Sequence, residues 1–196
     1  MSVSSSRKIT LILGAELEKL VTLPLVWLTL MGTFILNLVL AAAFTSVGLQ
    51  GAAGTQSILK IGLASMEYLQ AGFIILGILA TCSDYTGGQI RTTLTTIPWR
   101  GFQLSAKHLA LAIVTIPMAF IIAASGVLYA CIMMRDTALV IEIDALIKTL
   151  VGATGYLTLT TLLSAAIGVL LRRTTPALVV LLGHYFIVSP LLRVFL

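Results

Sequence analysis

Residues 109–134 read LALAIVTIPMAFIIAASGVLYACIMM, a continuous apolar run without a single Asp, Glu, Lys or Arg. A helix needs about 20 mostly apolar residues to cross the roughly 30 Å hydrocarbon core of a bilayer. The run is long enough to cross, and it does not alternate between apolar and polar residues as a barrel strand would. Since a spanning helix makes its backbone hydrogen bonds within itself, we predict a transmembrane α-helix here.

Four more apolar runs of this kind flank the first one. The five predicted spans cover about residues 20–44, 61–81, 109–134, 145–171 and 175–195. Composition agrees, because 59% of the 196 residues are hydrophobic and only 10% are charged, whereas a soluble domain carries about 25% charged residues. The sequence therefore predicts an all-α polytopic membrane protein with a single membrane domain, residues 1–196.

The basic residues predict the orientation of these spans. If the N-terminus is cytoplasmic, eight of the twelve Lys and Arg residues fall on the inner side, namely Arg7, Lys8, Lys19, Arg91, Arg100, Lys107, Arg172 and Arg173. The outer side then holds Lys60, Arg135, Lys148 and Arg193. The excess of Lys and Arg on cytoplasmic segments favours this orientation. The net charge of +5 is thus a topology signal, and nucleic-acid binding is not expected, since it would need a basic soluble face.

Residues 7–20, ahead of the first span, predict a helix lying in the inner membrane interface. Its apolar stripe consists of Ile9, Leu13, Leu17 and Leu20. Such a helix is expected to lay its apolar face into the bilayer surface. Glu16 falls inside the stripe, so it either snorkels to water or meets a basic partner, for which Lys107 is the candidate.

The polar segment 82–107 is the longest interruption between spans and is predicted to be cytosolic. Gly87 and Gly88 permit a sharp turn, because glycine adopts positive φ without strain. Residues 89–97 then predict a short amphipathic helix, which Pro98 would end by disfavouring α geometry at the residue before it. Two interpretations stay open: a lever moved by a partner protein, or a polar loop whose basic residues contact lipid phosphates.

Several motifs together resemble the bacterial type-2 ABC-transporter permease family. They are AELEKL at 15–20, SDYTGGQIRTTL at 83–94, Pro98, Arg100-Gly101, Ala106-Lys107 and GVLLRR at 168–173. Three departures stand beside them. Asp84 takes the place of the usual Glu, and Gln89 that of the usual Thr. Members usually have six spans where five are predicted here, so either the sequence is truncated or a sixth span is absent.

The resemblance implies a role for segment 82–107 as the coupling helix of a transport subunit. It would dock into a groove on a cytosolic ABC ATPase, which would itself bind ATP and Mg. The residues expected to couple are Asp84, Gly88, Ile90, Arg91, Thr92, Leu94 and Pro98, with Glu16 as support. The implied assembly is an exporter in the bacterial plasma membrane, built from two permease subunits, alike or paralogous, and two ATPase subunits.

Polar residues within the apolar runs are candidates for a substrate route, because such residues are costly in lipid. The candidates are Asn37, Glu67, Tyr68, Gln70 and His184. For Glu67 the alternative is a wet residue at the outer interface beside Lys60. The small-residue runs 41–43, 152–155 and 164–168 are interpreted as helix packing.

No enzymatic constellation is found in the sequence. It has no G-x-x-x-x-G-K-[ST] phosphate loop, so ATP hydrolysis is expected in a separate subunit. His108 and His184 stand far apart and outside any zinc motif, and no cofactor is expected in this chain. The rival hypothesis is a membrane protein without a motor, such as a small secondary carrier or an immunity or assembly factor. Inverted repeats around broken helices would favour a carrier, and no clear repeat is seen.

Overall fold

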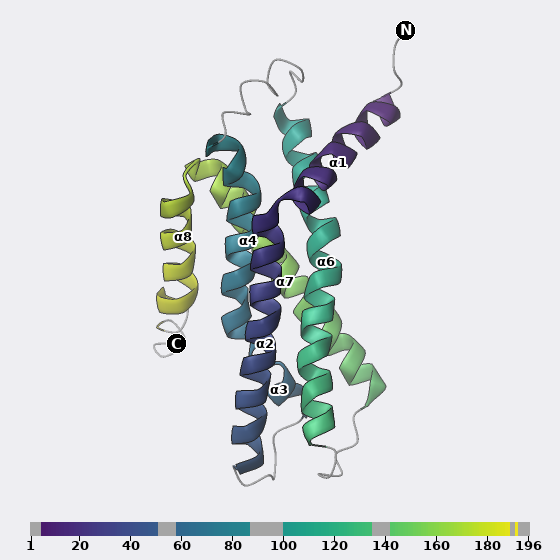
Figure 1. Cartoon of the computed structure of the whole chain (residues 1–196), viewed down its shortest axis with the longest axis vertical. Coiled ribbons are helices and arrows are strands. Elements are labelled where there is room, and N and C mark those ends of the chain that lie inside the picture. The colour runs from purple at the N-terminus through teal and green to yellow at the C-terminus, as the bar shows by residue number, and fades with distance from the viewer. Residues whose placement is uncertain (1–4, 51–57, 87–99, 135–141, 189–190, 192–196) are drawn as a thin grey trace.

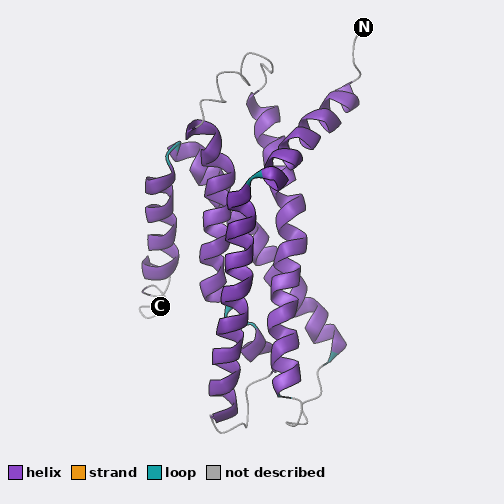
Figure 2. Cartoon of the chain, viewed as in Figure 1, coloured by secondary structure: helices purple, strands orange, loops and turns teal. Residues whose placement is uncertain are grey.

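The computed structural model describes residues 5–50, 58–86, 100–134, 142–188 and 191 (Figure 1). Every regular element in this part of the chain is helical (Figure 2). The elements are α1 (Ser5–Thr22), α2 (Pro24–Gln50), α3 (Ile58–Gly62), α4 (Met66–Thr86), α6 (Arg100–Met133), α7 (Ile143–Leu171), α8 (Thr174–Gly183) and the π-helix η2 (His184–Val188). The all-α class predicted from the sequence is thus confirmed.

Within the part of the chain that the structure describes, four segments are long and apolar enough to cross a membrane. They are Pro24–Gly48, Ile58–Ser83, Gln103–Met133 and Ile143–Leu171. They correspond to the first four predicted spans. The fifth predicted span, 175–195, is described only in part, as α8 of 10 residues and η2 of 5 residues, and its crossing stays a prediction.

Two predicted spans differ from the observed helices. The first span does not begin near residue 20, because the chain bends at Leu23 and α2 begins at Pro24. Proline disfavours α geometry at the preceding residue and is well placed at the first position of a helix. The second span is two helices, because α3 and α4 are separated by a turn at residues 63–65.

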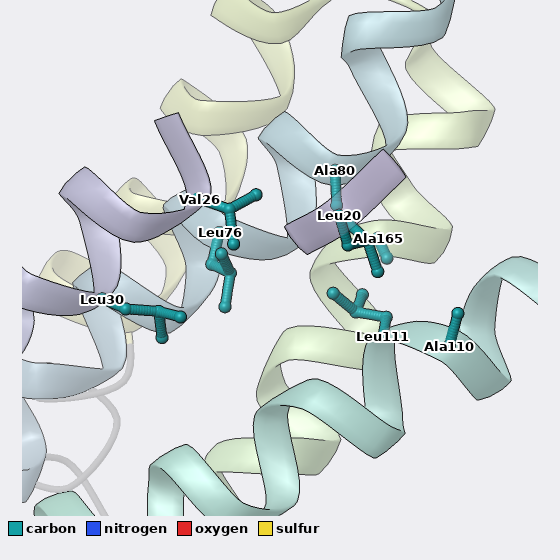
Figure 3. Close-up of a cluster of buried hydrophobic side chains, with 8 residues drawn as sticks. All are labelled: Leu20, Val26, Leu30, Leu76, Ala80, Ala110, Leu111 and Ala165. Atoms are coloured by element: carbon teal, nitrogen blue, oxygen red, sulfur yellow. The ribbon is translucent and has the colours of Figure 1, made fainter. Parts of the chain in front are cut away.

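The N-terminal helix lies on the protein rather than presenting its whole apolar stripe to lipid. Leu20 belongs to a buried cluster formed with α2, α4, α6 and α7, and Leu13 and Leu17 pack against it (Figure 3). The side chain of Ile9 lies outside the described part. The helix predicted at residues 7–20 is therefore present as α1. Its apolar stripe packs mainly against the helix bundle, because α6 extends as a helix back to Arg100 and supplies an apolar surface for it.

Helix α4 is the most buried of the four spans and packs against α2, α7 and α8. Two glycines allow this close packing. A Cβ on Gly72 would collide with the Thr33 side chain of α2, and a Cβ on Gly77 would collide with the backbone oxygen of Thr161 on α7. Small residues at helix interfaces let backbones approach closely, so α4 is held firmly on two sides.

The small-residue runs have different roles. Run 164–168 packs as predicted, since Ser164, Ala165 and Gly168 are buried and a Cβ on Gly168 would lie 2.6 Å from Thr81 Oγ1. Run 152–155 packs only in part, because Ala153 packs against a buried cluster and Thr154 is buried, whereas a Cβ on Gly152 or Gly155 would meet nothing within 4 Å. These two glycines lie on a part of α7 that no described neighbour covers closely.

Candidate functional sites

Figure 1 shows α1, the C-terminus of α4, the N-terminus of α6 and the turn between α7 and α8 gathered at one end of the bundle. We call this the basic end, because its described basic residues are Lys19, Lys107, Arg172 and Arg173, with Arg100 opening α6. The end of α2, α3, the end of α6 and the start of α7 form the opposite end. Helix α4 ends and α6 begins at the basic end, and the two helices extend into the predicted segment 82–107 as far as Thr86 and Arg100.

The predicted coupling residues lie only partly within the described structure. Gly88, Ile90, Arg91, Thr92, Leu94 and Pro98 lie outside the described residues, as does the predicted helix 89–97. Helix α4 continues to Thr86, so Asp84 is on its last turn. On the other side of the segment, Lys107 of α6 is only 7% exposed, and His108 Nδ1 lies 2.9 Å from the Leu104 carbonyl oxygen. The roles of these residues in coupling stay predictions.

Glu16 is half-buried on α1, and α1 packs against α6. Burial raises the pKa of this carboxyl above its ordinary value of 4.5, and the nearby charge of Lys19 opposes this shift. Burial likewise lowers the pKa of Lys19, with Glu16 opposing. The charge that acts on Glu16 is thus Lys19, three residues along the same helix, and the pairing of Glu16 with Lys107 stays a prediction.

The raised pKa of Glu16 leads to a pH-dependent stability. Because the pKa is higher folded than unfolded, this group's stabilising contribution is complete below about pH 4.5 and is lost as the pH rises through the raised pKa. At pH 7 the ionised carboxylate therefore opposes the docking of α1. We expect Glu16→Gln to raise the Tm at pH 7, by no more than about 4 °C for a chain of this length, and to leave it unchanged near pH 4.

Thermal unfolding in detergent at both pH values measures this effect. Glu18→Gln is the matched control, since Glu18 is exposed on the same helix. A lower Tm for Glu16→Gln at pH 7 would contradict the assignment of burial as the dominant cause.

Asn37 of α2 joins three parts of the bundle through its fully buried amide. Its Nδ2 donates to the Ile122 carbonyl oxygen at 2.8 Å and to Ser125 Oγ at 2.9 Å, both on α6. Its Oδ1 accepts a hydrogen bond from Ser65 Oγ at 2.8 Å, in the turn between α3 and α4. We call this set the Asn37 bracket. It faces neighbouring helices in this structure, so the predicted role of Asn37 in a substrate route gains no support.

The other predicted route residues contact different neighbours. Gln70 is 6% exposed and accepts a hydrogen bond from the Tyr156 hydroxyl of α7. Tyr68 stacks on Phe44 of α2 with ring centroids 6.0 Å apart. Glu67 and Lys60 are both exposed, which leaves the two interpretations of Glu67 open. His184, exposed at the start of η2, lies edge-on to Tyr185 at 5.6 Å. The described contacts do not unite these residues in one site.

Three polar residues in these contacts were missed from the sequence: Ser65, Ser125 and Tyr156. Each lies inside a predicted span, and a polar residue at such a position was the only indication in the sequence that it could form an interhelical contact. Serine is common in spanning helices as a packing residue, so the signal was weak without knowledge of which helices are neighbours. Among the described residues, no group of three or more His, Cys, Asp or Glu side chains is arranged to hold a metal ion.

Comparison with protein-family models, with curated proteins and with solved structures gave no match. The class of the protein therefore rests on its architecture. Four apolar helices of spanning length, with large apolar side chains such as Leu28, Val39 and Leu159 exposed around the bundle, indicate a polytopic α-helical membrane protein.

Proposed function

We propose that the chain is the transmembrane permease subunit of an ATP-binding cassette exporter in the bacterial plasma membrane. One observation carries this proposal. The segment whose motifs resemble the family's coupling loop begins within the end of α4 and finishes within the start of α6, and these two helix ends lie at the basic end beside α1 and the α7–α8 turn. A partner that grips this segment from the cytosol would thus act directly on two spans.

The packing of α4 suggests how movement would pass into the membrane. Helix α4 is continuous from Met66 to Thr86, and Gly72 and Gly77 bring it against the backbones or side chains of α2 and α7 without spare room. Packed cores move between discrete arrangements rather than deforming smoothly. A force on the segment after Thr86 would therefore tilt α4 together with α2 and α7, as one half of a two-permease assembly.

Charge also supports a cytoplasmic basic end. Lys19, Lys107, Arg172 and Arg173 belong to that end, whereas Lys148 at the opposite end pairs with Asp144 at 2.6 Å. By the positive-inside rule this distribution favours a cytoplasmic N-terminus. The partners proposed on this basis are cytosolic ABC ATPase subunits that carry ATP and Mg, a second permease subunit, and membrane lipids.

The decisive experiment is co-purification. The tagged chain, co-expressed in turn with candidate bacterial ABC ATPases, including any that is encoded beside its gene, is extracted in mild detergent and isolated. We expect the ATPase to co-purify and to hydrolyse ATP in the complex. Failure of every such ATPase to bind would overturn the proposal.

Orientation is tested separately by cysteine labelling in a background with Cys82→Ala and Cys131→Ala. Lys60→Cys is exposed on α3 at the opposite end, and Gly101→Cys is exposed at the start of α6 at the basic end. A membrane-impermeant thiol reagent is expected to label Lys60→Cys in intact cells and Gly101→Cys only after permeabilisation. The reverse pattern would place the segment on the wrong side for a cytosolic motor.

A secondary carrier is the second candidate, and the break between α3 and α4 is the observation that favours it. Carriers commonly bind substrate where spanning helices are interrupted. Here, however, the polar side chains beside the break are bonded to one another in the Asn37 bracket. A carrier needs no ATPase, so the co-purification experiment separates the two candidates.

A further inference from the structure

We propose that α3 is a latched half-helix, held against α6 by the Asn37 bracket, and that its release is required before the ends of α2 and α6 can separate at the opposite end. The latch is a property of the described structure alone. Its use as the outer gate of an exporter rests on the proposed function.

The first observation is the joint that makes α3 a separate body. Helix α3 ends at Gly62 and α4 begins at Met66. The backbone between them turns through short-range bonds, with Ala64 N–H donating to the Ile61 carbonyl at 3.2 Å and Met66 N–H to the Leu63 carbonyl at 3.0 Å. Because these bonds belong to the turn at residues 63–65, a change in the angle between α3 and α4 can be confined to this turn while both helices stay intact.

The second observation is that the bracket ties this joint to α6. Ser65 lies in the joint and donates to Asn37, and Asn37 donates to Ile122 and Ser125 on α6. Both N–H groups and the oxygen of the amide thus have partners. Buried amide groups without hydrogen-bond partners are costly in apolar surroundings. The Asn37 bracket therefore favours two states, one with its hydrogen bonds formed and water excluded, and one with these bonds broken and water bound to the freed groups.

The third observation is how closely α3 fits α6. A Cβ on Gly62 would lie 2.8 Å from Val127 Cα, and a Cβ on Gly126 would lie 2.6 Å from the Gly62 carbonyl oxygen. Ile58 and Ile61 of α3 are buried in a cluster with Ala130 of α6 and Met134, which follows the end of α6. Helix α3 also contacts α2, where Ile61 Cδ1 would lie 2.9 Å from a Cβ on Gly48. It therefore fills the seam between the two spans.

The test is disulfide formation in membranes, which needs no ATPase. In a background with Cys82→Ala and Cys131→Ala, the reporter pair Ile61→Cys with Ala130→Cys measures the position of α3. A reference pair, Ile78→Cys with Ala177→Cys, measures the packing of α4 on α8, where both residues share a buried cluster. We expect both pairs to oxidise readily in the parent protein.

Two variants release the latch by different means. Asn37→Leu removes the bracket at similar volume, and Gly126→Val drives α3 off α6. Each is expected to slow the reporter pair by about tenfold, an effect on the scale of interhelical hydrogen bonds and close packing, and to leave the reference pair unchanged. Matched controls are Gly152→Val, whose Cβ meets nothing within 4 Å, and Thr115→Val, whose buried hydroxyl bonds only within α6 in the described contacts.

Three outcomes would overturn the latch. In the first, the reporter pair does not oxidise in the parent protein. In the second, the reporter pair of the Asn37→Leu variant oxidises at the parent rate. In the third, the reference pair of the Asn37→Leu variant slows as much as its reporter pair. The last would assign Asn37 to the stability of the whole bundle. A latch confirmed here together with failed ATPase co-purification would retain the latch and remove its role in an exporter.

Discussion

Gly77→Leu is expected to destabilise the folded protein strongly. A Cβ at this position would collide with the backbone oxygen of Thr161, and it would lie 3.1 Å from the backbone nitrogen of Ala165. Backbone atoms cannot move aside as the end of a flexible side chain can, so α4 and α7 would have to separate. Forced overpacking costs about 3 kcal/mol at its upper range, which lowers the Tm of a chain of this length by roughly 6 to 12 °C.

Thermal unfolding of the detergent-solubilised protein, followed by size-exclusion chromatography, measures this loss. Gly32→Leu is the matched control, because Gly32 lies in the apolar α2 and a Cβ there would meet nothing within 4 Å. The control is expected to unfold at the parent temperature. Equal Tm values for Gly77→Leu and the parent would show that α4 and α7 do not pack as described, and the rigid tilting proposed for α4 would lose its basis.

Arg91→Glu is expected to abolish binding of the ATPase, while the chain itself stays inserted in the membrane. The resemblance implies a coupling role for Arg91, and the reversal would put a negative charge where a positive one is expected to be paired. Breaking a buried charge pair at an interface costs about 2 to 5 kcal/mol, so the amount of co-purified ATPase should fall at least about tenfold. Normal export or normal co-purification by this variant would contradict the coupling role.

Arg173→Glu is the matched control for this charge reversal. Arg173 is exposed in the turn between α7 and α8 at the same end of the bundle, outside segment 82–107. Its reversal changes the net charge equally and is expected to leave ATPase binding within about twofold of the parent, since exposed charges contribute little. If both variants lose the ATPase equally, the basic end acts only through its overall charge.

The candidate sites show where sequence reasoning stops. Asn37, Tyr68 and Gln70 were all noticed as polar residues in apolar runs, and that observation was sound. In the structure their side chains contact α6, α2 and α7 respectively. The sequence of one apolar run does not indicate which of the other runs packs beside it. The partners Ser65, Ser125 and Tyr156 were missed for the same reason, because each is an ordinary residue until the helices are assembled.

The amphipathic stripe of residues 7–20 illustrates a related limit. Its spacing predicted the helix α1 correctly, since periodicity depends only on the chain itself. The environment of the stripe was predicted wrongly in part, because Leu13, Leu17 and Leu20 contact the buried cluster at the basic end. An apolar face looks the same in sequence whether lipid or protein covers it.

The sequence by itself determined that this is an all-α membrane protein and where its first four spans lie, because apolar length and the need to satisfy the backbone in lipid leave no other structure. Only the tertiary structure decided that span two is broken at residues 63–65, that Gly77 and not Gly152 is a contact point, and that Asn37 closes a bracket. Those features depend on distances between residues far apart in the chain, such as the 85 positions that separate Asn37 from Ile122, and local composition does not record them.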